Sequence, residues 1–250
     1  MKFTIASDAF KRLITCSLVY PGSGKGFLPE VTAHVSSDGL DVSDMYLGTV
    51  ALKLCFKPSY FISFDPGDTK ELVLSALLFE EIKNKFVNDK ELIVNTEEEY
   101  LVIEGSREIF RMPLQRASSF DSSLPFVKSD YGAGLIGYLP AGMVPKVQAL
   151  IMPSVLNIGG EAVRFFCMPE SIKLLSTTIG TYEKVLVAQS DITPEMKLAL
   201  LDISFNSVYL EALTKMFVGA AWLSIDESAL ALSICSADFS MSYVLARLLD

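Results

Sequence analysis

Side chains that could carry catalysis are few in this sequence. His34 is the only histidine among the 250 residues, so a Ser-His-Asp relay, a Cys-His pair or a histidine-rich metal site would have to be centred on it. It lies in an alternating apolar stretch between Ala33 and Val35, and no G-x-S-x-G nucleophile elbow is present. We interpret His34 as a strand-surface or core residue, and we predict that the protein is not an enzyme.

The segment PGSGKG, residues 21–26, has some features of a phosphate-binding loop. The pattern G-x-x-x-x-G-K-[ST] is broken at both ends, because Val19 stands at the first glycine and Gly26 follows Lys25 in place of Ser or Thr. The segment also follows a predicted helix rather than a strand. We therefore predict a flexible connection at this place.

Residues that could bind a metal are also poorly placed. The acidic residues 80–81 and 97–99 form two runs of adjacent positions. Adjacent side chains on a helix or strand diverge, so the members of one run would not converge on a metal. The four cysteines are widely spaced, lie in apolar surroundings and form no C-x-x-C pair; they are Cys16, Cys55, Cys167 and Cys235. We predict solvated acidic faces, buried thiols, no metal and no cofactor.

The composition is that of a folded globular protein, with half of the residues apolar and a fifth charged. The formal net charge of −9 argues against a surface that coats nucleic acid everywhere, although a local basic face remains compatible with it. The sequence shows neither an uncharged run long enough to span a membrane nor a secretory signal. We expect a cytoplasmic protein, nuclear if its source is a eukaryote, with no membrane partner.

The predicted elements would position a surface rather than a catalytic cleft. Short alternating runs around the Asp38-Gly39 turn predict antiparallel strands. Apolar residues recur at helical spacing in four other places. Helices are expected within residues 7–21 and 68–86, at residues 141–153, where Pro145 falls in the first turn, and from Leu210 onward.

An internal repeat suggests duplication. Residues 79–103 align without a gap with residues 210–234, and the apolar positions are kept throughout. The alternative is that any two strand-helix-strand units share this periodicity. We favour two domains of one fold, at residues 1–115 and 132–250, joined by a connector at residues 116–131.

Each predicted helix also carries at least one cation away from its apolar face. If the helices line one side of the sheets, these cations form a sparse positive surface that could meet a phosphate backbone without reading bases. The alternative is that they are ordinary solvated side chains of helices. The candidate DNA-facing residues are Lys11, Arg12, Lys83, Lys85, Lys146 and Lys215.

Three stretches carry a resemblance to a known family. Residues 35–54 contain an acidic-Gly-Leu turn, a Met and a Val-Ala-Leu run, residues 122–150 contain a Leu-Pro connector, and residues 242–250 form a closing strand. Together they resemble the DNA sliding clamps of the proliferating cell nuclear antigen type, found in archaea and eukaryotes. Residues 46–48 depart from the family's Asp-Pro-Ser, and Arg247 stands where Pro is usual. These departures imply a changed partner choice or a divergent paralogue in a mixed ring.

The resemblance implies an α+β fold of two similar domains, each with antiparallel sheets outside and two helices inside. Three subunits would close into a ring, either a homotrimer or a heterotrimer with paralogous subunits. Edge strands at residues 108–114 and 171–177 would pair between subunits, through Ile109, Phe110, Met112, Ile172, Leu174 and Leu175. The partner-peptide pocket would comprise Met45, Val50, Leu124, Pro125, Phe126, Val244, Leu245 and Ala246.

The function implied by the resemblance is that of a DNA polymerase processivity factor in DNA replication and DNA repair. The ring would encircle duplex DNA without sequence preference and tether a polymerase, a flap nuclease and a ligase, and a clamp loader would open it. The alternative is a two-domain structural or binding protein of similar duplicated layout, for example a viral one, that does not encircle DNA.

Overall fold

The computed structural model describes residues 1–18, 30–46, 49–83, 85–86, 88–115, 125–132, 135–176, 183–188, 191–193 and 195–248. In these residues strands predominate over helices, and every strand pairing is antiparallel. The α+β class predicted from the sequence is confirmed.

The largest sheet has eight strands and combines strands from both halves of the chain. β19 (Phe239–Ala246) pairs with β4 (Val50–Phe56), so that residues far apart in the sequence share one continuous sheet. On the β19 side the sheet continues through β18 (Ala229–Cys235), β17 (Ala221–Ile225) and β12 (Val147–Ile151). On the β4 side it continues through β3 (Gly39–Tyr46), β2 (Glu30–Ser36) and β6 (Glu71–Ser75).

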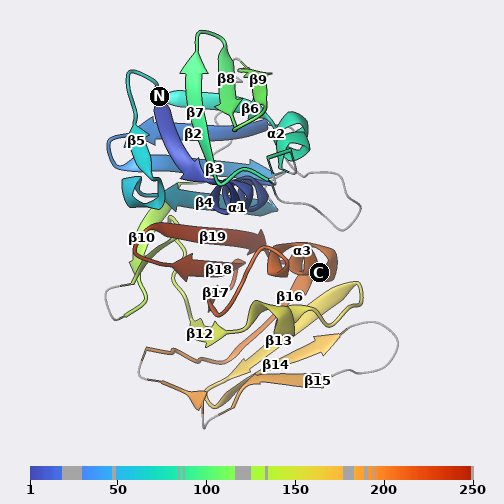
Figure 1. The fold of residues 1–250 in the computed structure, drawn as a ribbon. Coiled ribbons are helices and arrows are strands. Elements are labelled where there is room, and N and C mark those ends of the chain that lie inside the picture. Colours follow the sequence, from blue (N-terminus) through green and yellow to red (C-terminus); the bar gives the residue numbers. More distant parts are fainter. Residues whose placement is uncertain are drawn as a thin grey trace.

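Two smaller sheets lie at opposite ends of the molecule, at the top and the bottom of Figure 1. The upper sheet has the strand order β5 (Ser63–Asp65), β1 (Lys2–Ala6), β7 (Glu91–Glu97), β8 (Tyr100–Glu104) and β9 (Ile109–Pro113). The lower sheet has the order β15 (Glu183–Val187), β14 (Ser171–Ser176), β13 (Ala162–Met168) and β16 (Leu201–Asn206). β9 and β15 each end a sheet.

Helices cover one face of the eight-stranded sheet, which we call the helix face. The apolar residues of α1 (Ser7–Ser17) point into the core, and the Tyr243 hydroxyl of β19 donates a hydrogen bond to the Cys16 carbonyl. α3 (Ser207–Thr214) contacts β19 as well, and α2 (Ala76–Ile82) contacts α1. Asn206 caps α3 by accepting from the backbone N–H of Val208 at 3.0 Å. Two short 3-10 turns, η1 (Pro58–Tyr60) and η2 (Pro153–Leu156), complete the helical elements described.

A two-stranded hairpin covers the opposite face, which we call the hairpin face. It consists of β10 (Phe126–Asp130) and β11 (Ile136–Pro140), and β11 contacts β18 and β19. Because side chains alternate along a strand, β19 directs Tyr243 and Leu245 into the core and Val244 toward the hairpin. The largest sheet is therefore packed on both sides.

The helix predicted at residues 141–153 is wrong. Residues 141–146 form a turn and a short connection, β12 follows at Val147–Ile151, and only the η2 turn is helical. β12 pairs along its whole length with β17 and buries Val147 and Ile151. A five-residue apolar run suits either a helix or a strand, and here pairing with β17 decides the outcome.

Candidate functional site

The groups considered for catalysis or metal binding are not brought together in the residues that the structure describes. His34 is exposed on β2, and no cluster of three His, Cys, Asp or Glu residues that could hold a metal occurs in the described ranges. The four cysteines are free thiols, and burial raises the pKa of the Cys16 thiol to about 11. The segment at residues 21–26 lies outside the described residues. None of the helices described is long and apolar enough to cross a membrane.

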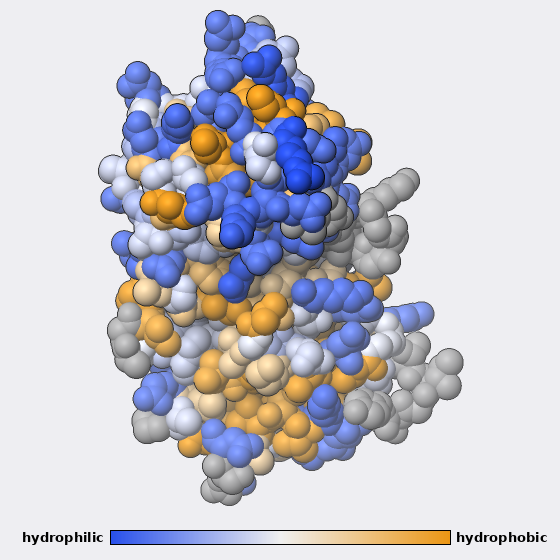
Figure 2. Space-filling view, viewed as in Figure 1, coloured by the Kyte–Doolittle hydropathy of each residue, from blue (hydrophilic) through white to orange (hydrophobic). Residues whose placement is uncertain are grey.

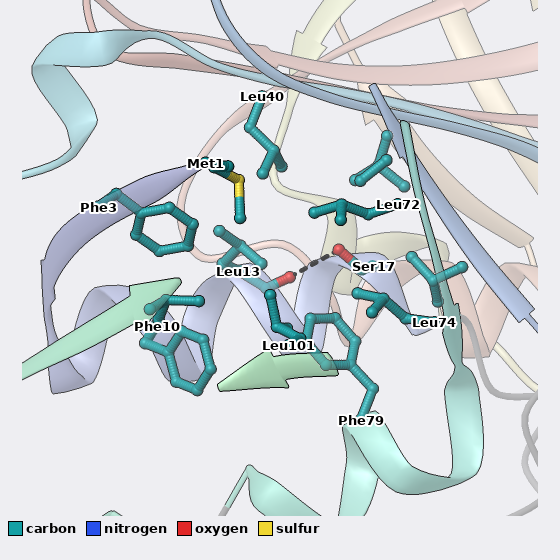
Figure 3. Close-up of a pocket in the computed structure, with 14 residues that line it drawn as sticks. Met1, Phe3, Phe10, Leu13, Ser17, Leu40, Leu72, Leu74, Phe79 and Leu101 are labelled. Carbon is teal, nitrogen blue, oxygen red and sulfur yellow. Dashed lines mark hydrogen bonds between the residues drawn. The ribbon is translucent and has the colours of Figure 1, made fainter. Parts of the chain in front are cut away.

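An internal cavity of about 20 Å³ lies in the core beside α1. Apolar side chains surround it, including Phe3, Leu40 and Leu101, as Figure 3 shows. The hydroxyl of Ser17 also lines it but already donates to the Leu13 carbonyl at 2.9 Å. A cavity of this size holds at most about one water and offers it no free polar partner, so we interpret it as a packing void.

A larger groove of about 390 Å³ opens on the hairpin face, where β3, β4 and β19 meet the turn after β11. The strand register places Met45, Ala51 and Val244 in one row across three adjacent strands. Among the described residues that line it none is charged, and Thr49 and Ser228 are polar. The groove is lined by Met45, Thr49, Val50, Ala51, Pro140, Ala141, Gly142, Met143, Ser228, Ala229, Val244 and Ala246.

The predicted partner pocket overlaps this groove in part. Its lining includes four of the predicted residues, Met45, Val50, Val244 and Ala246. Leu245 points to the opposite face and is buried in the core. Pro125 and Phe126 lie outside the lining, Phe126 at the start of β10, and Leu124 lies outside the described residues.

Sequence reasoning missed the turn at residues 140–143 and the short connection at residues 228–229, which supply the rest of the wall. The turn was hidden because these residues were assigned to a helix. The Pro-Ala-Gly sequence is typical of a turn, and Gly142 does adopt a φ of +89°. That signal could have identified the wall.

Asp44, the neighbour of Met45, provides a test of pH dependence. Burial, with a smaller contribution from the charge of Glu30, raises the pKa of Asp44 from 3.8 to about 6. The folded carboxyl therefore keeps its proton to a higher pH than the unfolded one, and the protein loses stability as the pH rises from about 4 to 6. We expect Asp44→Asn to remove this loss. The asparagine oxygen can still accept the Met45 N–H.

In urea unfolding, Asp44→Asn should match the parent protein at pH 4 and exceed it at pH 8. The gain should be roughly 1 kcal/mol, less than the whole shift would give, because the carboxyl is only partly buried. Asp38→Asn, in the exposed turn before β3, controls for net charge. Parallel pH profiles for Asp44→Asn and the parent protein would refute this assignment.

The six candidate DNA-facing cations differ in their exposure and in their ion pairs. Lys11 and Arg12 are exposed on α1, and the Arg12 guanidinium lies 4.4 Å from the Phe239 ring centre. Lys83 ends α2, and Lys85 follows it with its ammonium 4.7 Å from the Phe110 ring centre. These four residues leave a group of positive charge beside α1 and α2.

The two cations of the C-terminal half are neutralised. Lys215 ends α3 and forms an ion pair with Glu211 at 2.8 Å. Lys146 lies outside any helix, contrary to the prediction, and pairs with Glu227. Of the six candidates, those without an ion pair to a described residue therefore all belong to the N-terminal half.

Of the two strands predicted to pair between subunits, β9 ends a sheet and β14 does not. β9 is an edge strand, with Ile109 65% exposed, Phe110 half-buried and Met112 buried. β14 is an interior strand between β13 and β15.

The side chains of β14 confirm that it is no edge. Ile172 and Leu174 are buried and Leu175 is half-buried. The free edge belongs to β15, where Val185 is 50% exposed. The sequence analysis placed this edge one strand too early.

Figure 2 shows the surface from the same side as Figure 1. Its upper part is mainly hydrophilic, whereas hydrophobic residues gather over the lower part, where the C-terminal elements lie. Exposed apolar side chains of these elements include Leu150, Met152, Val185 and Leu200. An apolar surface of this kind is typical of an interaction site.

Comparisons with known proteins identify the fold. No protein-family model and no curated protein sequence matches the chain. Solved structures do match over nearly the whole length. The PCNA of A. fulgidus, solved with the C-terminal region of FEN-1 bound, has a TM-score of 0.79 and 10% identity, covering 100% of this chain and 98% of that one.

Two further matches are of the same kind. The PCNA2–PCNA3 complex of Sulfolobus tokodaii gives a TM-score of 0.76 at 15% identity, and the PCNA of Thermococcus kodakaraensis gives 0.75 at 14%. Each covers 99% of this chain and 99% of the matched chain. The chain therefore has the PCNA fold, and the resemblance seen in the sequence is confirmed at the level of the fold.

Proposed function

We propose that the chain is a subunit of a three-membered ring that encircles duplex DNA and holds partner proteins on it as a processivity factor. The observation that carries the proposal is the full-length PCNA fold at TM-scores from 0.75 to 0.79 in these three comparisons. The ring needs no catalytic group, because a closed ring on DNA is retained by topology rather than by tight contacts.

Ring closure is supported by two of the strands that end a sheet, β9 and β15. β9 and β15 end different sheets at opposite ends of the molecule (Figure 1). Pairing β9 of one subunit with β15 of the next would satisfy both edges and repeat head to tail until the ring closes. The PCNA2–PCNA3 complex of Sulfolobus tokodaii supports a paralogous subunit as the neighbour.

Partner binding is supported by the groove. None of the described lining residues is charged, so an apolar side chain of a partner could enter without leaving a charge buried and unpaired. The A. fulgidus PCNA with the bound FEN-1 region makes a nuclease a reasonable candidate partner. A polymerase, a ligase and a clamp loader complete the proposed set.

DNA contact should depend mainly on Lys11 and Lys83. Neither forms an ion pair with another described residue, whereas Lys215 is already paired with Glu211. We expect the double change Lys11→Glu and Lys83→Glu to weaken binding of a labelled short duplex about tenfold or more at low salt, and to flatten its salt dependence. Lys215→Glu alone should weaken binding less. Fluorescence anisotropy across a salt series measures both.

Lys128→Glu, compared with Lys11→Glu alone, provides the matched control, because the two changes alter the net charge equally and Lys128 is exposed on the hairpin, across the sheet from the helices. An equal loss of affinity for Lys128→Glu and Lys11→Glu would contradict a DNA-facing helix face. It would show that net charge alone governs binding.

A second candidate function is a binding protein of this fold that does not encircle DNA. The pairing of Lys146 and Lys215 with glutamates favours it, because it reduces the attraction of the C-terminal half for phosphate. Such a protein would still bind partners in the groove. Its duplex binding would be weak, and equally so for the parent protein and for the double change Lys11→Glu and Lys83→Glu.

A further inference from the structure

The β10–β11 hairpin is bound to the eight-stranded sheet by large buried side chains. Tyr131, in the connection between its strands, is 2% exposed, and Leu139 of β11 is 3% exposed. They pack against a cluster on the hairpin face formed by Ala51, Trp222, Ala231 and Val244. The Tyr131 ring stacks on Trp222 with 5.6 Å between the ring centres.

Polar contacts and close packing fix the position of the hairpin. The Tyr131 hydroxyl donates to Ser233 Oγ at 3.0 Å, and Ser233 shares a further hydrogen bond of 2.8 Å with Ser242. A Cβ on Gly137 would lie 2.6 Å from the Tyr131 ring and 2.7 Å from Cys235 Sγ. The backbone of β11 therefore approaches the sheet as closely as a glycine allows.

The same hairpin supplies one wall of the groove. β11 ends at Pro140, and the turn through Met143 lines the groove opposite β3 and β4. Met45 and Met143 both pack against the cluster on the hairpin face. The width of the groove thus depends on how the hairpin is seated, and the adaptable side chains of its lining are two methionines, Met45 on β3 and Met143 in the turn after β11.

We propose that the β10–β11 hairpin is a fixed wall of the groove, and that Met143 determines which apolar side chain of a partner peptide enters. This inference rests on the partner-binding role proposed above. The occupant is an uncharged aliphatic or aromatic anchor of a partner, because the described part of the lining offers it apolar side chains and no charge to pair with. Met143 restricts the bulk of that anchor.

Trp222 makes the proposal directly testable, because it is the only tryptophan of the chain and is buried beneath Tyr131. Its emission reports whether the hairpin is seated. The probes are short synthetic peptides that are identical except for a single Leu or Phe anchor and that contain no tryptophan. We expect binding to leave the Trp222 emission maximum unchanged, and a red shift on binding would show a movable lid and overturn the proposal.

Met143→Ala should then shift the preference toward the Phe peptide. Removing the methionine widens the groove, so the Phe peptide should gain about tenfold over the Leu peptide relative to the parent protein. An unchanged preference would overturn the role of Met143 while leaving partner binding intact. Failure of every peptide to bind would overturn the docking function itself, which keeps the two failures distinct.

Gly137→Val should unseat the hairpin, shift the Trp222 emission to the red and weaken both peptides, because its side chain meets Tyr131 and Cys235. If this variant does not fold by circular dichroism, Leu139→Ala serves as the milder change. Lys128→Ala, exposed on β10 of the same hairpin, should leave the emission and the peptide preference unchanged. Peptide binding that survives a red-shifted Gly137→Val or Leu139→Ala unaltered would overturn the proposed wall.

Discussion

Arg111→Pro in β9 is expected to convert the assembled ring into folded monomers. Next to β9, Gly105 N–H donates to the Glu108 carbonyl at 2.9 Å and Leu114 N–H donates to the Glu99 carbonyl at 2.7 Å. In an antiparallel ladder the bonded pairs alternate, so the backbone N–H of Arg111 points away from β8. It lies at the free edge, where the next subunit would pair.

Proline at this position removes the N–H and adds a ring at the edge, without breaking a bond of the β8–β9 ladder. The lost bond and the unpaired acceptor on the neighbour should weaken each interface about 100-fold. Native mass spectrometry should show monomers, and circular dichroism should show an unchanged fold. Arg111→Ala, which keeps the N–H, is the control and should still assemble. Equal assembly of the two variants would contradict edge pairing through β9.

Gly39→Ala is expected to be among the most damaging single changes to stability. Gly39 opens β3 with a φ of +128°, and a Cβ there would lie 2.0 Å from the backbone oxygen of Phe56 on β4. The strained backbone and the clash together should cost about 3 kcal/mol or more of unfolding free energy. β3 carries Met45 to the groove, so peptide binding should fall in parallel.

Gly142→Ala separates the cost of the strained backbone from the cost of the clash. Gly142 also has a positive φ, +89°, but a Cβ there would meet nothing within 4 Å. It should cost only the conformational part, about 1 kcal/mol. Urea unfolding of both variants measures the difference, and equal losses would show that the contact with Phe56 is unimportant.

The groove could be predicted in part because strand alternation is a local property. Met45 and Val244 follow a period of two along their strands, and that period decides which face each side chain joins. The same rule would have excluded Leu245, which lies between Val244 and Ala246 and so faces the core. Local patterns also predicted the mixture of strands and helices, and the family resemblance supplied the fold.

The seating of the hairpin could not be predicted, because long-range contacts create it. Residues 135–140 are an apolar run typical of a strand and Tyr131 is an aromatic residue in a polar stretch, but only the contact of Tyr131 and Leu139 with Trp222 and Val244 shows which surface they cover. The β12 strand was missed for the same reason, since pairing with β17 determines it. The division into domains at residues 1–115 and 132–250 stays a prediction.

The mass of the protein in solution tests the central claim most directly. The account predicts a three-chain assembly, either when the protein is alone or when it is mixed with paralogous subunits from the same source. Native mass spectrometry and light scattering both report this number. A chain that stays monomeric alone and in every such mixture would contradict the ring.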